Sequence, residues 1–233
     1  MVTATARIEE QAALKLRQAT IADIPFLARI VYEASLPPLN HCFWDDLLHD
    51  MSTTSVQFIE AMLQADASNW GGVEDFFVLT EHDRPVAAAA GYSPSPDNYC
   101  PLRLENLDQL AAILNWSPTI TQTFRDRYTQ LWGGNFKPEF FKPIAPWIIE
   151  TVAVVPEARG RGLVKVLLRG LLDAGRSQGH ERAGIMVING NDAAYRAYTS
   201  LGFKPYQTFH TDYFAGLFQL EFPGITKLGL SLA

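Results

Sequence analysis

Apolar and polar residues alternate in a pattern that predicts several strands along the chain. Residues 14–19 alternate with a period of two, which is typical of a half-buried strand. Residues 76–80 and 86–92 flank the polar segment 81–85 and predict a hairpin. Residues 147–155 form a nearly continuous apolar run bounded by prolines. Such a run favours a central strand that is covered on both faces.

A helix and a further strand follow this central run. Residues 163–174 place leucines and valines on one helical stripe and charged residues opposite, and Gly179 suits the C-terminal cap. Residues 183–188 then return to an apolar strand pattern. The order strand, helix, strand predicts two parallel strands joined by a crossover helix.

The remaining periodicity predicts weaker elements around this unit. Apolar positions over residues 24–31 have helical spacing, and a short helix is expected at 192–200. Residues 93–146 interrupt the strands with two helical stripes and are interpreted as a helical insertion. Two further strands are expected at 206–210 and 214–222.

Composition and charge narrow the class of protein. With 233 residues and 48% hydrophobic content, the chain can bury roughly 70% of its unfolded surface without a metal or disulfide. We therefore expect one α/β domain over residues 1–233, with an insertion at about 93–146. A formal charge of −6 disfavours nucleic-acid binding. No apolar run reaches the roughly 18 residues that a membrane span needs, and the first residues lack a signal-peptide core. A cytoplasmic, membrane-free protein is expected, in which Cys42 and Cys100 are free thiols.

A glycine- and arginine-rich loop joins the central strand to the helix that follows it. Residues 159–162 read Arg-Gly-Arg-Gly. Unpaired amides and the positive end of a helix favour a phosphate there. A Walker loop is excluded because Gly-Lys-Ser/Thr is absent. A dinucleotide-binding loop would need a third glycine at the position of Lys165. Glu181 lies about twenty residues after the loop, as the ribose-binding acid of that motif would, but it precedes its strand, whereas the motif places the acid at the end of the strand.

A coenzyme A loop is the third candidate, and here the chain resembles the GNAT acetyltransferase superfamily. Residues 159–164 match that family's Arg/Gln-x-x-Gly-x-Gly/Ala motif except at Val164. Residues 191–203 resemble its second motif, with Asn, Ala, Tyr and Gly-Phe at the expected offsets, and residues 16–24 resemble its first strand and helix. The resemblance implies an α/β fold with a mixed, twisted central sheet of GNAT type and flanking helices. It does not extend to the helical insertion.

The resemblance also implies a site. The two parallel strands would splay apart, the pantetheine arm of the coenzyme would fill the gap, and the diphosphate would lie on the loop. The residues expected to bind the coenzyme are Val152, Val154, Arg159, Gly160, Arg161, Gly162, Leu163, Val164, Asn191 and Tyr198.

Each chemical role has a candidate residue. A backbone amide near Val152 is the candidate donor to the oxyanion, because a splayed strand has unpaired donors. Tyr198 matches the family's proton donor to the departing thiolate. Glu150 is the candidate base, because its apolar neighbours should raise the pKa of its carboxyl toward neutrality.

The sequence therefore predicts an N-acetyltransferase that moves an acetyl group from acetyl-CoA, its cosubstrate, to a small-molecule amine within a ternary complex. A non-catalytic coenzyme A binding module and a transferase of longer acyl groups stay open as alternatives. The oligomeric state is also open, and a homodimer is compatible with the sequence. No metal is expected, because a polar helix face explains His41, Asp45 and His49 better than a metal site does. An apolar acceptor pocket is a hypothesis that rests on the aromatic residues Trp116, Trp132, Phe136, Phe140, Phe141 and Trp147.

Overall fold

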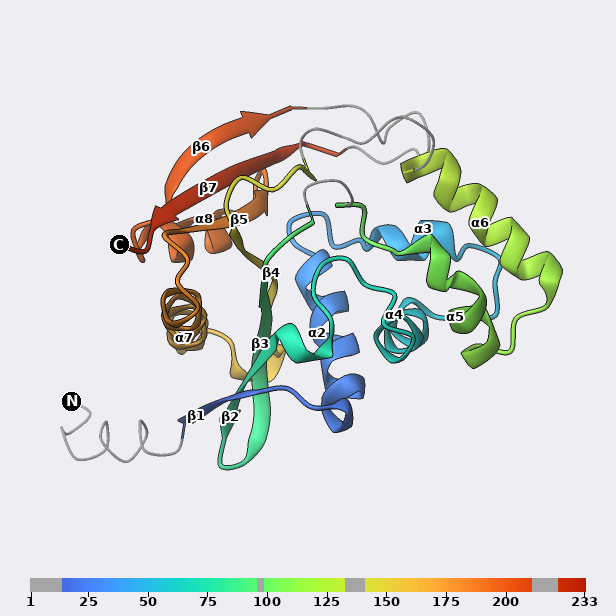
Figure 1. The fold of residues 1–233 in the computed structure, drawn as a ribbon, viewed down its shortest axis with the longest axis horizontal. Helices are drawn as coiled ribbons and strands as arrows, with labels where there is room; N and C mark the ends of the chain where they lie inside the picture. The colour runs from blue at the N-terminus through green and yellow to red at the C-terminus, as the bar shows by residue number, and fades with distance from the viewer. Residues whose placement is uncertain (1–13, 96–98, 133–140, 211–221) are drawn as a thin grey trace.

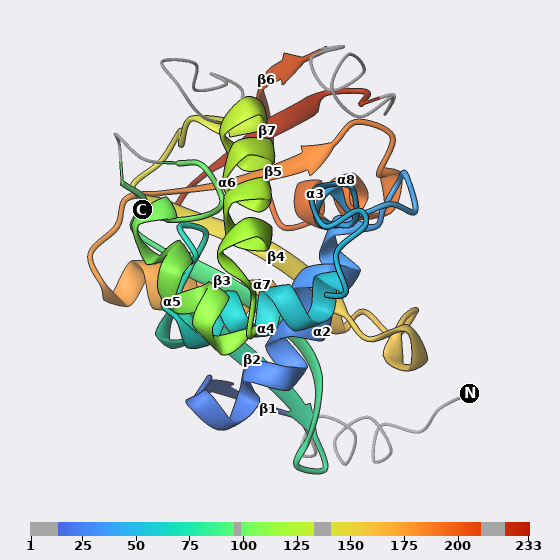
Figure 2. The same ribbon diagram turned by 90° about the vertical axis from the view of Figure 1, so that its right-hand side faces the viewer.

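A mixed seven-stranded sheet forms the centre of the molecule in the part that the computed structural model describes, residues 14–95, 99–132, 141–210 and 222–233. Its strand order is β1-β2-β3-β4-β5-β7-β6 (Figures 1 and 2). Only the β4–β5 pairing is parallel. The mixed central sheet predicted from the sequence is thus confirmed. The strands are β1 (Leu14–Gln18), β2 (Phe76–Glu81), β3 (Arg84–Tyr92), β4 (Trp147–Val154), β5 (Arg182–Ile188), β6 (Lys204–Phe209) and β7 (Ile225–Ser231).

Helices cover both faces of the sheet. Helix α7 lies on one face, while α2 and α4 lie on the other, with α5 and α6 beyond α4 (Figure 1). Each of the two long helices that pack on the sheet buries an apolar stripe, as the helical periodicity predicts. The helices are α2 (Ile24–Ser35), α3 (Phe43–Leu47), α4 (Ser55–Gln64), α5 (Leu107–Ile113), α6 (Pro118–Trp132), α7 (Leu163–Ser177) and α8 (Asp192–Thr199). Short 3₁₀ turns are η1 (Ile21–Asp23), η2 (Val73–Asp75), η3 (Leu104–Asn106) and η5 (Pro156–Ala158).

The close approach of α7 to the sheet depends on small residues opposite a tryptophan. A Cβ added to Gly91 or to Gly175 would lie 2.6 or 2.8 Å from the ring of Trp147. The Trp147 indole donates a hydrogen bond to the carbonyl of Leu171 at 3.1 Å. These contacts fix β4 against the helix that follows it, and with it the loop between them.

The predicted hairpin and insertion helices are present. β2 and β3 pair antiparallel around a turn at His82 and Asp83, whose φ angles of 49° and 60° suit a two-residue hairpin turn. Residues 93–146 contain α5 and α6, which bury most of the predicted apolar positions. None of the helices in the described residues is both long and apolar enough to cross a membrane. Cys42 and Cys100 are both buried, and their sulfurs are not bonded to each other.

The last strand of the chain was not predicted. The strand expected at 214–222 falls almost entirely outside the described residues, and the strand that pairs with β5 is β7. Lys227 interrupts the apolar pattern of β7, yet it is only 2% exposed. Its ammonium donates to the carbonyl of Lys142 at 2.7 Å. Because its charge has a hydrogen-bond partner, this lysine can be buried, and a charged residue within the apolar run makes the strand pattern hard to recognise.

Candidate active site

Strands β4 and β5 separate halfway along their length. Their parallel register runs from Trp147 opposite Ala183 to Ile149 opposite Ile185 and then stops. From Glu150 onward the facing edges of the two strands have no ladder between them. The predicted splay is therefore present in the structure.

A bulge in β4 accompanies this separation. Ala88 of β3 pairs with Ala153 and Ala90 pairs with Glu150, so Thr151 and Val152 together lie opposite the single residue Ala89. Thr151 has a φ of 54°, in the left-handed region that β-branched residues rarely adopt. A bulge bends its strand and takes backbone groups out of the ladder. The bulge thus leaves the backbone around Val152 outside the regular β3–β4 ladder.

The loop after β4 depends on two glycines for its direction. Gly160 and Gly162 have φ angles of 79° and 76°, and Gly162 is the N-cap of α7. A Cβ added to either glycine would meet no atom within 4 Å. Glycine is therefore required here by the backbone conformation, and the space in front of the loop is open.

The amides of this loop are available to a ligand. Among the described residues, no acceptor takes the amide hydrogens of Gly160, Gly162, Leu163 or Val164. They stand at the positive end of a 15-residue helix. A diphosphate fits this arrangement, since anions bind where unpaired amides and a helix N-terminus coincide.

The two arginines of the loop have different surroundings. Arg159 donates to the carbonyl of Val154 at 3.0 Å and pairs with Glu33 of α2 at 2.7 Å. Arg159 lines the cavity described below. Arg161 instead pairs with Glu81 of β2, with one N–O distance of 2.9 Å, and does not line that cavity. Of the residues expected to bind the coenzyme, Arg161 is the one whose side chain lies elsewhere.

One large cavity brings the other predicted site residues together. Its volume is about 540 Å³, and it extends from the glycine loop through the gap between the strands to the space under α3. The predicted residues that line it are Glu150, Val152, Val154, Arg159, Gly160, Gly162, Leu163, Val164, Asn191 and Tyr198. Asn191 also caps α8, because its side chain accepts from the amide of Ala194 at 3.2 Å.

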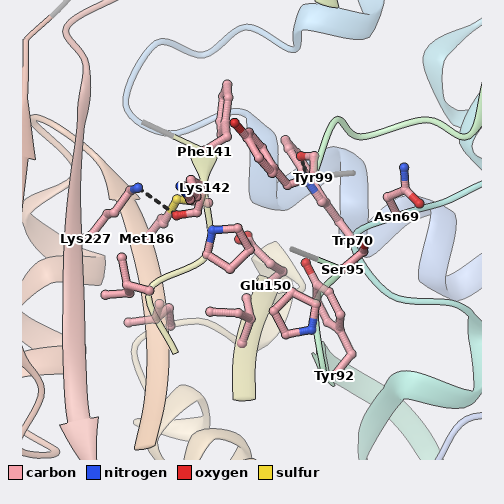
Figure 3. A pocket seen from close by; sticks show the side chains of 15 residues that line it. Asn69, Trp70, Tyr92, Ser95, Tyr99, Phe141, Lys142, Glu150, Met186 and Lys227 are labelled. Carbon is pink, nitrogen blue, oxygen red and sulfur yellow. Dashed lines mark hydrogen bonds between the residues drawn. The ribbon is translucent and has the colours of Figure 1, made fainter. Parts of the chain in front are cut away.

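The carboxyl of Glu150 lies in apolar surroundings at the point where the strands part. Burial raises the pKa of this carboxyl to about 8, and a hydrogen bond from the Thr151 backbone opposes the shift. The carboxyl can therefore exchange a proton near neutral pH. Glu150 also lines a smaller pocket of about 20 Å³, where Figure 3 shows it below Trp70 and Phe141.

Tyr198 enters the same cavity from α8. The residue is 6% exposed, and burial together with the negative charge of Glu150 raises the pKa of its hydroxyl well above the ordinary value. The phenol consequently stays protonated across the neutral range. A protonated phenol can donate to an anion that forms nearby.

The hypothesis of an aromatic acceptor pocket needs correction at particular residues. Trp132 and Phe141 line the cavity. Trp116 instead packs beside Phe124 at 5.3 Å between ring centroids, and Trp147 lies beneath α7. Phe136 and Phe140 fall outside the described residues. Phe43, Trp44 and Trp70 also line the cavity, although the aromatic hypothesis does not include them.

His41 and Asp45, which a metal site in this segment would need as ligands, have other partners. His41 contacts Asp46 at 2.8 Å and lies before α3, while Asp45 accepts from Ser55. Burial raises the pKa of the neighbouring Cys42 thiol to about 11, so it is a poor nucleophile. Within the described residues, no three His, Cys, Asp or Glu side chains are grouped so that they could hold a metal.

Comparisons with known proteins agree with this geometry. Residues 134–203 match the family model described as the acetyltransferase (GNAT) family. An N-acetyltransferase from Staphylococcus aureus Mu50 is similar over 93% of this chain and 100% of its own, with a TM-score of 0.58 and 20% identity. Ard1 from Thermoplasma volcanium is similar over 95% of this chain and 99% of its own, with a TM-score of 0.52 and 16% identity.

A third similar structure contains a ligand. It is yncA from Salmonella typhimurium with its cofactor acetyl-CoA, similar over 95% of both chains, with a TM-score of 0.50 and 16% identity. A search of curated proteins gave no match. At such identities the solved structures show the fold. The resemblance to the GNAT acetyltransferases is therefore confirmed, by the family model over residues 134–203 and by the fold over nearly the whole chain.

Proposed function

We propose that this chain is an N-acetyltransferase that moves the acetyl group of acetyl-CoA to the amine of a small molecule by direct attack in a ternary complex. The observation that carries the proposal is the shared cavity. It joins the open amides of the glycine loop and the gap between β4 and β5 to Glu150 and Tyr198. In this proposal residues 1–233 act as one domain, and the 93–146 insertion helps to form the acceptor end.

The coenzyme end fits the cosubstrate in two ways. The unpartnered amides of Gly160, Gly162, Leu163 and Val164 suit a diphosphate. The unpaired edges beyond Ile149 suit an extended pantetheine arm, which would bind as a short strand. The similar structure of yncA, solved with acetyl-CoA, supports this assignment. Val164 is the one residue that departs from the motif, and its partly buried side chain packs against the core.

The chemistry follows from the residues around the gap. The acceptor nitrogen attacks the thioester carbonyl, so that an N–C bond forms while the C–S bond breaks. Glu150 takes the proton that the nitrogen loses, which its pKa of about 8 permits. The bulged backbone near Val152 donates to the oxyanion, and the protonated Tyr198 donates to the departing thiolate.

The test measures binding and turnover separately. Calorimetry with acetyl-CoA reports the coenzyme end, and release of the free thiol in the presence of an amine panel reports catalysis. Binding with turnover supports the proposal. Binding without turnover on any acceptor would favour the coenzyme A binding module, and absence of binding would contradict both. Comparing acetyl-CoA with longer acyl-CoA donors decides the acyl chain length.

A further inference from the structure

Five aromatic rings form a continuous wall at the end of the cavity away from the glycine loop. Consecutive ring centroids are 4.3, 5.8, 5.1 and 5.5 Å apart. All five side chains line the cavity. This aromatic wall consists, in order of contact, of Trp44, Phe43, Trp132, Phe141 and Trp70.

The wall is assembled from distant parts of the chain. Phe43 and Trp44 begin α3, Trp70 precedes β2, and Trp132 ends α6. Figure 3 shows Trp70 and Phe141 facing the region of Glu150 from separate segments. The wall therefore meets the proposed base at one end, where an acceptor nitrogen must lie.

The charged side chains that line the cavity are nearly all paired within the described residues. Glu33 and Arg159 pair with each other at 2.7 Å at the coenzyme end. His41 contacts Asp46 at 2.8 Å. Glu150 is left as the acid that faces the acceptor. In the described part of the lining of this cavity, a second charge on the acceptor would thus be buried among rings with Glu150 as the one unpaired charged group, which is costly.

We infer that the acceptor is a primary amine carried on an aromatic or alkyl body that bears no second charged group. This inference rests on the proposed function and adds the class of substrate. The body of the acceptor packs against the aromatic wall and loses water-exposed apolar surface. Its nitrogen lies beside Glu150, which takes one proton as the N–C bond forms and the C–S bond breaks. The wall thereby selects against amino acids, polyamines and peptide N-termini.

The test uses acceptors that differ by one charge. 2-Phenylethylamine is compared with phenylalanine, which adds a carboxylate, and hexylamine with 1,6-diaminohexane, which adds an ammonium. We expect kcat/KM to be at least about tenfold higher for the first member of each pair, since the added charge has to be desolvated. A peptide with a free N-terminus is included as a third kind of acceptor.

The outcomes separate the two proposals. Equal or higher turnover on phenylalanine, the diamine or the peptide overturns the inference and leaves the acetyltransferase proposal intact. Acetyl-CoA binding without turnover on any member of the panel overturns both.

Variants of the wall provide a second readout. Phe141→Glu places a carboxylate in the wall and should shift the kcat/KM ratio of diaminohexane to hexylamine upward by at least about tenfold, while the KM of acetyl-CoA stays unchanged. Phe43→Glu serves as the second variant if the first does not fold. Tyr206→Glu on β6, where the side chain is 71% exposed, is the matched control and should leave the ratio unchanged. An unchanged ratio in both folded wall variants overturns the inference.

Discussion

The two ends of the cavity are built in opposite ways. The proposed coenzyme end offers backbone groups of one short segment, 159–164, and both arginine side chains in it are paired with acids of other elements. The acceptor end uses side chains from several separate segments, whose rings touch in series. Recognition by backbone groups suits the coenzyme, which is the same in every reaction cycle. Side chains of the acceptor end can be substituted one at a time without moving the 159–164 loop. In the proposed enzyme, acceptor specificity therefore resides in the side chains of the acceptor end.

The largest expected effect lies at the junction of the two ends. Glu150→Gln removes the proposed base and should lower kcat by about 10²- to 10⁴-fold. In the unmodified protein kcat/KM should rise with pH through about 8, because the carboxyl must be ionised to accept a proton. The variant should lose this rise. Asp75→Asn is the control, since burial also raises the pKa of Asp75 but it does not line the cavity. A pH profile that survives in Glu150→Gln would contradict the assignment.

The same carboxyl affects stability. Its pKa of about 8 in the folded state exceeds the ordinary value of 4.5, so between these pH values the folded chain binds a proton that the unfolded chain has released. Stability should therefore fall as pH rises from about 4.5 to about 8. Urea unfolding at pH 5 and pH 8 measures this, and Glu150→Gln should show a smaller fall. An equal fall in both proteins would mean that the carboxyl ionises freely in the folded state.

Two glycines that flank α7, Gly162 before it and Gly179 after it, separate stability from binding. Gly162→Ala and Gly179→Ala both place a Cβ at a positive φ, 76° and 82°, with no atom within 4 Å. Each should cost about 1–2 kcal/mol of stability. Only Gly162→Ala should weaken acetyl-CoA binding, by about tenfold, because it alone disturbs the amides of the loop. Equal acetyl-CoA affinities by calorimetry would remove the loop from coenzyme binding.

Tyr198→Phe should lower kcat about tenfold while acetyl-CoA affinity changes little, since only the hydroxyl is lost. Stopped assays with the preferred amine give the first quantity and calorimetry the second. Unchanged kcat would exclude the hydroxyl from the mechanism.

The smallest effect is expected at Arg161. Its pair with Glu81 lies on the surface, where ion pairs contribute about 0–1 kcal/mol. Arg161→Gln should therefore change acetyl-CoA affinity less than about threefold. Arg159→Gln is the informative comparison, because Arg159 lines the cavity and binds the Val154 carbonyl. A larger loss in Arg161→Gln than in Arg159→Gln would show that Arg161 contacts the coenzyme after all.

The strand, loop and helix of the proposed coenzyme end could be predicted from the sequence because their determinants are local. The apolar run of β4, the glycines at 160 and 162 and the stripe of α7 are contiguous, and the structure places them as expected. The pKa of Glu150 is raised by burial, in the direction expected from its apolar neighbours in sequence.

The acceptor end and the last strand resisted prediction for physical reasons. Trp70 reaches the site only through tertiary packing. Trp132 is among the residues expected there and lines the cavity, but nothing near it in sequence distinguishes it from Trp116 or Trp147, which pack elsewhere. Lys227 breaks the apolar pattern of β7, and the carbonyl that lets its charge be buried belongs to a residue 85 positions away in the sequence. The side chain of Arg161 fits the motif by spacing, yet its partner Glu81 lies on another strand.

The conformation of Thr151 has a consequence for engineering. A threonine held at a φ of 54° costs of order 1–3 kcal/mol, and its buried hydroxyl has no hydrogen-bond partner within the described part of the chain. Substitutions selected only for a higher melting temperature would relieve this tension by letting β4 straighten. A straight β4 would pair with β5 along its whole length and close the gap between the two strands. Thermostabilised variants therefore need to be screened for retained cosubstrate affinity.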